Sequence, residues 1–220
     1  MSTKISIKRD YLNGTRYSLA QGKDWYHFNG DTELLGRFLE VYDGETVLDI
    51  GCNQGALLYY AKEKADIIGI GVDVFSEVLE SAKENAIYNR VNFQFICSRI
   101  QEYKAELVDV IVCNPPYFSG DIKNNNLYLD TARREKYLPL RDLMEAVHRL
   151  LKGNGRFYIV QKAEKIGSMI EEAHEQGLSC VRMGLAYAHV HSKAKTVLME
   201  FKWGQRKDCL VEKAIYLDQR

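Results

Sequence analysis

A short polar and aromatic motif, Asn114-Pro115-Pro116-Tyr117, directly follows the apolar run 107–113. Each proline favours an extended backbone in the residue before it and removes one backbone N–H, so a buried strand cannot continue through the pair. The motif therefore predicts a central strand that ends by presenting an amide side chain, two backbone carbonyls and an aromatic ring. The simpler alternative is a strand that ends in a rigid turn, with Tyr117 as a packing residue.

This set of groups suits an exocyclic amino group attached to a planar ring. The lone pair of such a nitrogen is delocalised into the ring, which makes the nitrogen a poor nucleophile. The side-chain oxygen of Asn114 and the Pro115 carbonyl can accept its two N–H bonds and favour the pyramidal, nucleophilic form. Tyr117 can stack on the ring, and such stacking contributes about 1–3 kcal/mol per base. The motif predicts chemistry at an amino nitrogen.

A glycine-rich turn, 51–55, lies between a predicted strand at 46–50 and a predicted helix. Such a turn forms a crevice in which the backbone can approach a ligand closely. One acid, Asp49, precedes the turn, and a second, Asp73, ends the next predicted strand at 67–72. In the simpler interpretation, each aspartate caps the helix that follows it.

Strands and helices alternate along most of the chain. The expected strands are 46–50, 67–72, 91–97, 107–113, 156–160, 180–187 and 196–203. The expected helices begin at a cap formed by Asp31 or Thr32, at Ala56, at Phe75, at Pro139 and at Ala163. The first of these ends at Asp43-Gly44, the fourth is closed by 153–155, and the tail from Gly204 has a weak helical pattern.

This alternation predicts an α/β, doubly wound, Rossmann-like fold whose seven-stranded sheet is mostly parallel and is covered by helices on both faces. The last two strands have no helix between them, which predicts an antiparallel hairpin at the sheet edge. Ligands bind beyond the carboxyl ends of the strands in such sheets. Because 49–55, Asp73 and 114–117 all fall at such ends, we expect them to form one site.

The composition is that of a globular chain of 220 residues, 46% hydrophobic and 27% charged. The 30 basic and 30 acidic residues cancel, which argues against indiscriminate coating of nucleic acid but permits a local basic patch. The five scattered cysteines favour reduced thiols in the cytoplasm, and neither they nor the five histidines predict a metal site. No apolar run has the length of a membrane span or a signal peptide.

The chain divides into an arm and a larger unit. Residues 1–28 are basic and aromatic, and we expect them to form an N-terminal arm of the same domain that 29–220 builds. The arm either faces RNA or is a solvated leader lying over the core. A polar segment, 119–126, is expected to be a loop that closes over a substrate.

The run Asp49-x-Gly51-x-Asn53-x-Gly55 resembles the first motif, D-x-G-x-G-x-G, of the S-adenosylmethionine-dependent methyltransferases. Asn53 replaces the middle glycine, and Asn is among the residues that tolerate a left-handed backbone. The turn lacks G-x-G-x-x-G, which makes a nicotinamide dehydrogenase the weaker interpretation.

The resemblance implies that this turn, including Cys52, passes close to the amino-acid end of S-adenosylmethionine. It implies that Asp49 accepts from the cofactor's ammonium group, directly or through water, and that Asp73 binds the ribose hydroxyls. Ile100 follows the third strand, where the adenine contacts are expected, although the acid often found there is missing. Cys52 has no catalytic partner in the sequence, so we expect it to be a packing residue.

Asn114-Pro-Pro-Tyr117 together with this upstream turn resembles the amino-group methyltransferases, which act on adenine N6, cytosine N4 or a glutamine amide. Residues 28–35 are similar to the F-x-x-D-x-x-L-L segment of the bacterial valine-tRNA adenine-N6-methyltransferases, and 132–135 and 191–194 are similar to stretches of that family. The resemblance implies methylation of tRNA at adenosine 37, beside the anticodon, by a chain expected to be a monomer.

The resemblance also implies roles for individual residues. Asn114 and Pro115 hold the amino group next to the cofactor, Pro116 and Tyr117 complete the catalytic motif, and Phe118 helps Tyr117 stack on the base. Arg133, Arg134, Lys136 and Lys193 are expected to meet RNA phosphates, although each one has the simpler interpretation of a solvated charge. The alternatives are methylation of rRNA or of a protein glutamine amide, or a non-catalytic RNA-binding protein that binds the cofactor.

Overall fold

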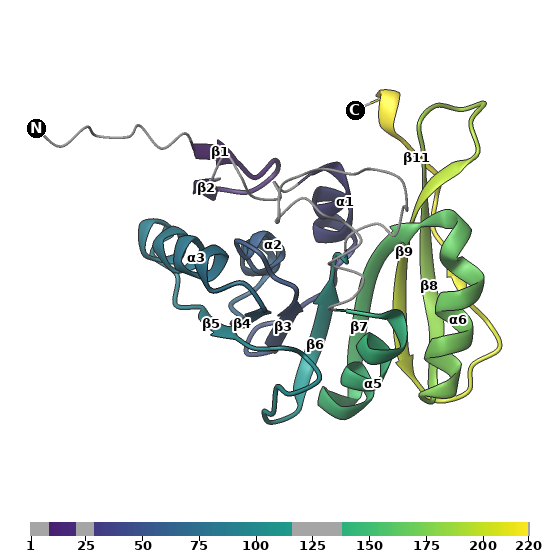
Figure 1. The fold of residues 1–220 in the computed structure, drawn as a ribbon. Helices are drawn as coiled ribbons and strands as arrows, with labels where there is room; N and C mark the ends of the chain where they lie inside the picture. Colours follow the sequence, from purple (N-terminus) through teal and green to yellow (C-terminus); the bar gives the residue numbers. More distant parts are fainter. Residues whose placement is uncertain (1–8, 21–28, 116–137, 220) are drawn as a thin grey trace, which may run out of the picture.

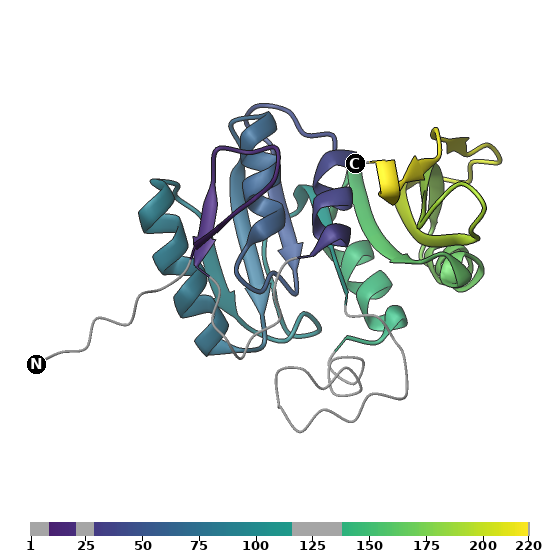
Figure 2. The ribbon, with the colours of Figure 1, turned by 90° about the horizontal axis from the view of Figure 1, so that it is seen from above.

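A twisted, mostly parallel sheet forms the centre of the molecule, and helices lie on both of its faces (Figures 1 and 2). The computed structural model describes residues 9–20, 29–115 and 138–219. Within these ranges the larger sheet has nine strands, in the order β10-β8-β9-β7-β6-β3-β4-β5 with β11 also paired to β8. The expected α/β class, the mostly parallel sheet and its antiparallel edge are confirmed.

Seven strands of this sheet correspond to those predicted from the sequence. The parallel ones are β3 (Thr46–Ile50), β4 (Ile68–Asp73), β5 (Gln94–Cys97), β6 (Val108–Cys113) and β7 (Leu151–Lys162). The other two, β8 (Leu178–Tyr187) and β9 (Ala194–Trp203), form the antiparallel hairpin. Because β9 runs opposite to β7, the loop 188–193 lies at the same edge of the sheet as the carboxyl ends of β6 and β7.

Two apolar cores follow from the period-two alternation of side chains along the strands. Along β6, Val110 and Val112 belong to one core, and Ile111 and Cys113 belong to the other. The first core is covered by α1 (Gly30–Phe38) and α2 (Ala56–Lys64). The second is covered by α5 (Leu140–Leu150) and α6 (Ile166–Glu175), which follows the short 3-10 turn η1 (Ala163–Lys165). None of the helices in the described ranges is long and apolar enough to cross a bilayer.

The described part of the N-terminal arm is a small hairpin, β1 (Arg9–Tyr11) and β2 (Ser18–Ala20), which packs near α3 (Ser76–Asn89). The buried amide of Asn85 on α3 holds it: the side-chain oxygen accepts from the Ala20 N–H at 2.8 Å, and the side-chain nitrogen donates to the Ala20 carbonyl at 3.2 Å. Leu12 and Leu19 are fully buried in the first core. This part of the arm therefore lies over the core.

The predicted cap of the first helix is wrong. The N-cap is Asn29, whose side-chain oxygen accepts from the N–H groups of Asp31 and Thr32 at 3.1 and 3.2 Å. The helix also ends earlier than predicted, at Phe38, because Leu39 adopts an extended conformation. Thr32 is consequently a residue of the first turn, and its hydroxyl is available for a contact outside the helix.

Two more predictions at the level of elements are wrong. The segment 153–155 does not close a helix, because β7 starts at Leu151 and runs through it, with an irregular register against β6 between Val108 and Val110. The tail is not helical over most of its length. It adds two short strands to the edge strand β8, β10 (Leu210–Val211) and β11 (Ile215–Tyr216), before the 3-10 turn η2 (Leu217–Gln219).

Candidate active site

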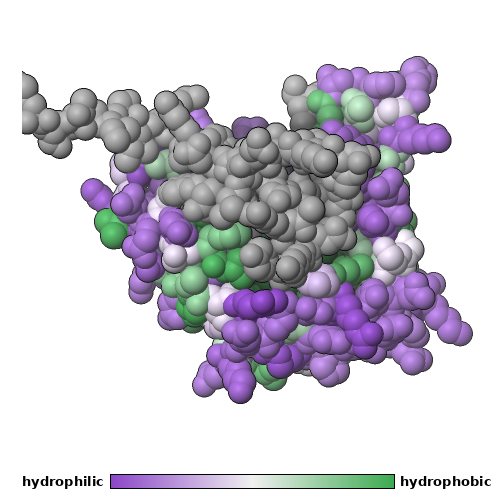
Figure 3. Space-filling view, viewed as in Figure 1, coloured by the Kyte–Doolittle hydropathy of each residue, from purple (hydrophilic) through white to green (hydrophobic). Residues whose placement is uncertain are grey.

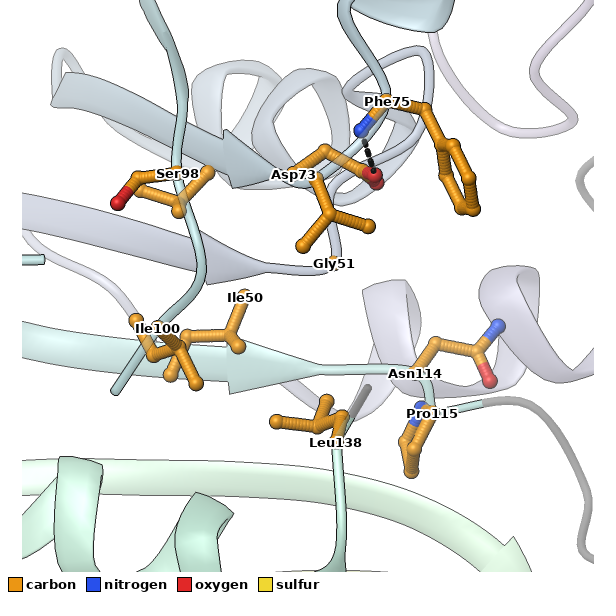
Figure 4. Close-up of a pocket in the computed structure, with 11 residues that line it drawn as sticks. Ile50, Gly51, Asp73, Phe75, Ser98, Ile100, Asn114, Pro115 and Leu138 are labelled. Carbon is orange, nitrogen blue, oxygen red and sulfur yellow. Dashed lines mark hydrogen bonds between the residues drawn. The ribbon is translucent and has the colours of Figure 1, made fainter. Parts of the chain in front are cut away.

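A pocket opens at the carboxyl edge of the sheet, between the ends of β3, β4 and β6 (Figure 4). It encloses about 600 Å³, counted out to its open mouth. The lining residues belong to the strand ends or follow them closely in the chain, apart from one residue that precedes α5. They are Ile50, Gly51, Val72, Asp73, Val74, Phe75, Ser98, Ile100, Asn114, Pro115 and Leu138. The pocket lies where a doubly wound sheet binds ligands.

The turn after β3 has a left-handed backbone at three positions. Gly51, Asn53 and Gly55 have φ angles of 70°, 50° and 80°. The N–H of Gly51 donates to the Val72 carbonyl of the neighbouring strand at 2.8 Å, which fixes the turn against β4. A Cβ added to Gly51 would meet no heavy atom within 4 Å, so its backbone faces open space in the pocket. Asn53 adopts the conformation that its position in the motif requires.

Asp73 joins this turn to the segment before α3. One carboxylate oxygen accepts from the Asn53 N–H at 2.9 Å, and the other accepts from the Phe75 N–H at 3.1 Å, a bond drawn in Figure 4. The N-cap of α3 is Phe75, so Asp73 lies before the cap position and its side chain borders the pocket. The carboxylate is therefore held in place by two backbone groups.

Asp49 has very different surroundings, although it lies on the adjacent strand. Its side chain is 2% exposed, and its Oδ1 has no hydrogen-bond partner among the described residues. Burial, and secondly the charge of Asp73, raise the pKa of Asp49 well above its ordinary value. The side-chain nitrogen of the neighbouring, buried Gln54 also has no partner within the described ranges. Asp49 does not cap α2, whose N-cap is Gly55.

Asn114 follows the last residue of β6. Its side-chain nitrogen donates to the hydroxyl of Thr32 on α1 at 2.9 Å. Thr32 is only 5% exposed, so water has little access to this bond. Pro115 is buried next to it, and both residues lie across the pocket from Asp73 and Phe75 (Figure 4). The strand end thus places an amide side chain at a pocket whose opposite wall carries a carboxylate.

The structure brings five of the predicted site residues into the pocket wall: Gly51, Asp73, Ile100, Asn114 and Pro115. Four others, Asp49, Cys52, Asn53 and Gly55, lie in or beside the turn and do not line the pocket. Cys52 is buried at 4% exposure, and burial raises the pKa of its thiol well above the ordinary value. A buried, protonated thiol suits the packing role expected for this residue.

The remaining predicted residues are away from the pocket or cannot be located in it. Lys193 is exposed on the loop between β8 and β9. Pro116, Tyr117, Phe118, Arg133, Arg134 and Lys136, together with the segment 119–126, lie outside the described residues. The prediction missed the lining residues Ile50, Val72, Val74, Phe75, Ser98 and Leu138. Their positions directly after or near strand ends were the available signal, because their residue types carry none.

Sequence comparison relates the chain to methyltransferases, and structural comparison shows the same fold in solved structures. A family model described as a methyltransferase domain matches residues 42–211. A protein from Dyadobacter fermentans, named tRNA1(Val) (adenine(37)-N6)-methyltransferase, is 26% identical over 197 residues, which cover 86% of this chain and 81% of that protein. A release factor glutamine methyltransferase from Haemophilus influenzae is 33% identical over 156 residues, which cover 62% of this chain and 53% of that protein.

Among solved structures, the chain is similar to a TehB-like SAM-dependent methyltransferase from Corynebacterium glutamicum. The TM-score is 0.54, the sequence identity is 18%, and the match covers 80% of this chain and 89% of that one. At this identity the likeness concerns the fold.

Proposed function

The chain belongs to the methyltransferase domain family, and from this premise we propose that it transfers a methyl group from S-adenosylmethionine to the exocyclic N6 of an adenine in tRNA, at adenosine 37 of a valine tRNA. The similarity to the Dyadobacter fermentans protein, which extends over 86% of the chain, supports this choice of substrate. In this proposal residues 29–220 form the catalytic domain and the N-terminal arm belongs to it.

The observation that carries the proposal is the orientation of Asn114 at the end of β6. Its amide nitrogen is occupied by Thr32, at 2.9 Å, which leaves the amide oxygen to accept from a substrate. An oxygen acceptor next to a backbone carbonyl, at the rim of a pocket of about 600 Å³, suits an amino group that carries two N–H bonds.

The residues around the glycine-rich turn fit S-adenosylmethionine. The cofactor carries an ammonium group, and the buried Oδ1 of Asp49 has no partner in the described part of the chain. Its ribose carries hydroxyl donors, and Asp73 presents a carboxylate at the pocket wall. The open space in front of Gly51 permits close approach of a ligand to the backbone. When bound, this cofactor would supply an electrophilic methyl group on a sulfonium centre, leaving S-adenosylhomocysteine as the product, and the methylated nitrogen would lose one proton.

The chain's own residues then act mainly by holding the base. The Asn114 oxygen and the Pro115 carbonyl accept the two N–H bonds of the adenine amino group. This favours the pyramidal form of the nitrogen, in which the lone pair is less delocalised into the ring and more nucleophilic. Positioning of this kind can contribute several kcal/mol to catalysis by itself. Apolar side chains of Ile50, Val72 and Leu138 line the same pocket. The adenine must leave its stack to enter the pocket, as in other enzymes that modify bases.

Asn114→Ala tests the proposal. We expect wild-type protein to form N6-methyladenosine in valine tRNA that lacks this modification, as measured by nucleoside mass spectrometry. The variant should lower kcat by about 10²-fold or more, the size reported for loss of one positioned hydrogen-bonding group in an active site. Cofactor affinity, measured by calorimetry, should stay within a few-fold of wild type. A wild-type protein that methylates no tRNA would refute the proposed substrate.

A second candidate is methylation of a protein glutamine amide, favoured by the 33% identity to the Haemophilus influenzae protein. A glutamine amide also carries a conjugated NH₂ group, so Asn114 and Pro115 can hold it in the same way. This match covers a smaller share of both chains than the match to the tRNA-modifying relative. Methyl transfer to release factors, assayed beside tRNA in the same experiment, separates the two candidates.

A further inference from the structure

The hydrogen bond between Thr32 and Asn114 joins residues 82 positions apart in the sequence, one in the first turn of α1 and one after β6. It matters because a side-chain amide has two ends of nearly the same shape and opposite chemistry: the oxygen accepts, and the nitrogen donates. Rotation of Asn114 by half a turn would present the wrong end to a substrate without any steric cost. Something in the structure must select one orientation.

The start of α1 holds the groups that can make this selection. The Oδ1 of Asn29 accepts from the backbone N–H groups of Asp31 and Thr32, at 3.1 and 3.2 Å, so Asn29 cannot rotate without losing both bonds. The Thr32 hydroxyl lies 3.5 Å from the same oxygen and can donate its single proton to it. A hydroxyl that donates to Asn29 offers only lone pairs to Asn114, and only the NH₂ end of that amide can pair with them.

We propose that Thr32 is a positioning residue that turns the amide oxygen of Asn114 toward the substrate amino group. The inference rests on the proposed function, because it assigns an orientation to the Asn114 side-chain amide, the group that holds the target nitrogen. The orientation is set by a series of hydrogen bonds. The backbone N–H groups of α1 hold Asn29, Asn29 accepts from the Thr32 hydroxyl, and that hydroxyl accepts from Asn114. The start of α1 is anchored separately, since the Thr196 hydroxyl of β9 donates to the Asp31 carboxylate at 3.1 Å.

Three variants test the role of Thr32 in catalysis. Thr32→Val keeps the side-chain shape but removes the hydroxyl, and we expect kcat for tRNA methylation to fall about tenfold, as for one lost hydrogen bond of ordinary strength. The cofactor Kd should not change. Thr32→Ser keeps the hydroxyl and should restore kcat to within about twofold of wild type. Thr196→Val is the matched control, because it removes a buried hydroxyl of β9 that contacts the same helix start but not Asn114.

A second readout does not depend on activity. The Asn114 side-chain amide protons can be identified in ¹H–¹⁵N spectra by their absence in Asn114→Asp. We expect them to be protected from exchange in wild type and Thr32→Ser and to lose that protection in Thr32→Val. Unchanged protection in Thr32→Val, or an equal loss of kcat in Thr196→Val, would overturn the inference. A wild-type protein inactive on tRNA would instead refute the proposed function, while the spectra would still decide how Asn114 is held.

Discussion

Two aspartates on adjacent strands show how much the surroundings of a residue decide what it can do. The carboxylate of Asp73 accepts from the N–H groups of Asn53 and Phe75. Asp49 is almost completely buried and has an oxygen without a partner among the described residues, which raises its pKa. Asp49 therefore binds a proton more tightly in the folded than in the unfolded protein, and the contribution of this residue to the stability of the free protein should fall as pH rises above the ordinary value of 3.8.

The same pKa shift predicts how binding of S-adenosylmethionine depends on pH. An ammonium group beside Asp49 favours the carboxylate, so binding should lower its pKa, release a proton and tighten as pH rises above the ordinary aspartate range. Asp49→Asn should weaken binding about tenfold or more, as for a hydrogen bond to a charged group, and should flatten the pH dependence. Calorimetry in buffers of different ionisation enthalpy measures both quantities.

The exposed Asp66, after α2, provides the matched control for this prediction. Asp66→Asn should bind the cofactor as wild type does, with the same proton release. Equal proton release by wild type and Asp49→Asn would show that Asp49 is not the group that titrates.

At this scale the sequence predicted five of the pocket-lining residues, among them Asp73 and Asn114, and missed six. Asn114 and Asp73 were predictable because their residue types carry chemistry and both follow apolar runs. Phe75 and Ser98 line the pocket mainly through their place after β4 and β5, which residue type does not reveal. Thr32 was misread as a helix cap, but the N-cap is Asn29, three residues earlier, so Thr32 lies inside the first turn of α1. Only the tertiary contact with Asn114 distinguishes the two roles.

At the scale of elements, α1 reaches the site because it packs closely on α2. Gly36 on α1 faces Tyr60 on α2, and a Cβ added to Gly36 would lie 2.3 Å from the Tyr60 ring. Gly36→Ala should lower the free energy of unfolding by about 1–3 kcal/mol, the usual cost of overpacking a core. The comparison is Gly30→Ala in the same helix, where an added Cβ meets nothing within 4 Å and the change should stay within about 0.5 kcal/mol.

Urea unfolding of both variants, followed by circular dichroism, checks this prediction. Equal midpoints for Gly36→Ala and Gly30→Ala would mean that α1 can move away from α2 without cost. Such freedom would also weaken the view that α1 holds Thr32 at a fixed place.

The order of the elements was predictable, while several boundaries were not. Alternating strands and helices have distinct apolar periods, and these gave the parallel sheet and the antiparallel hairpin. The residues 153–155 have the composition of a turn, yet they lie within β7, in the stretch between Leu151 and Arg156 where its register against β6 is irregular. The tail forms β10 and β11 by pairing with the edge strand β8. Pairing with a distant strand leaves no local signal in a segment of two residues.

At the scale of the whole molecule, the net charge of zero conceals an uneven distribution along the carboxyl edge of the sheet. The strand β7 lies beside β6, which leads into Asn114. It ends at Lys162, which pairs in register with Thr196 of β9. Lys193 and Lys195 flank the start of β9 and are exposed, and Lys165 is in the turn after β7. Two acids lie in this region, Glu164 in the same turn and Asp31, which accepts from Thr196. The end of the β8–β9 hairpin is mostly hydrophilic in the space-filling view (upper right of Figure 3). Basic groups therefore extend from the pocket toward the antiparallel edge.

This distribution suits the phosphates of an RNA that places one base in the pocket. In the double variant Lys193→Ala/Lys195→Ala we expect weaker tRNA binding, an unchanged kcat at saturating tRNA, and a slope of log affinity against log salt that is smaller by about two, one for each lost phosphate contact. Lys83→Ala/Lys104→Ala changes the net charge equally at two exposed positions outside this edge and should leave the slope unaltered. If both double variants changed the slope alike, the effect would arise from total charge, and the tRNA would have to approach the pocket from another side.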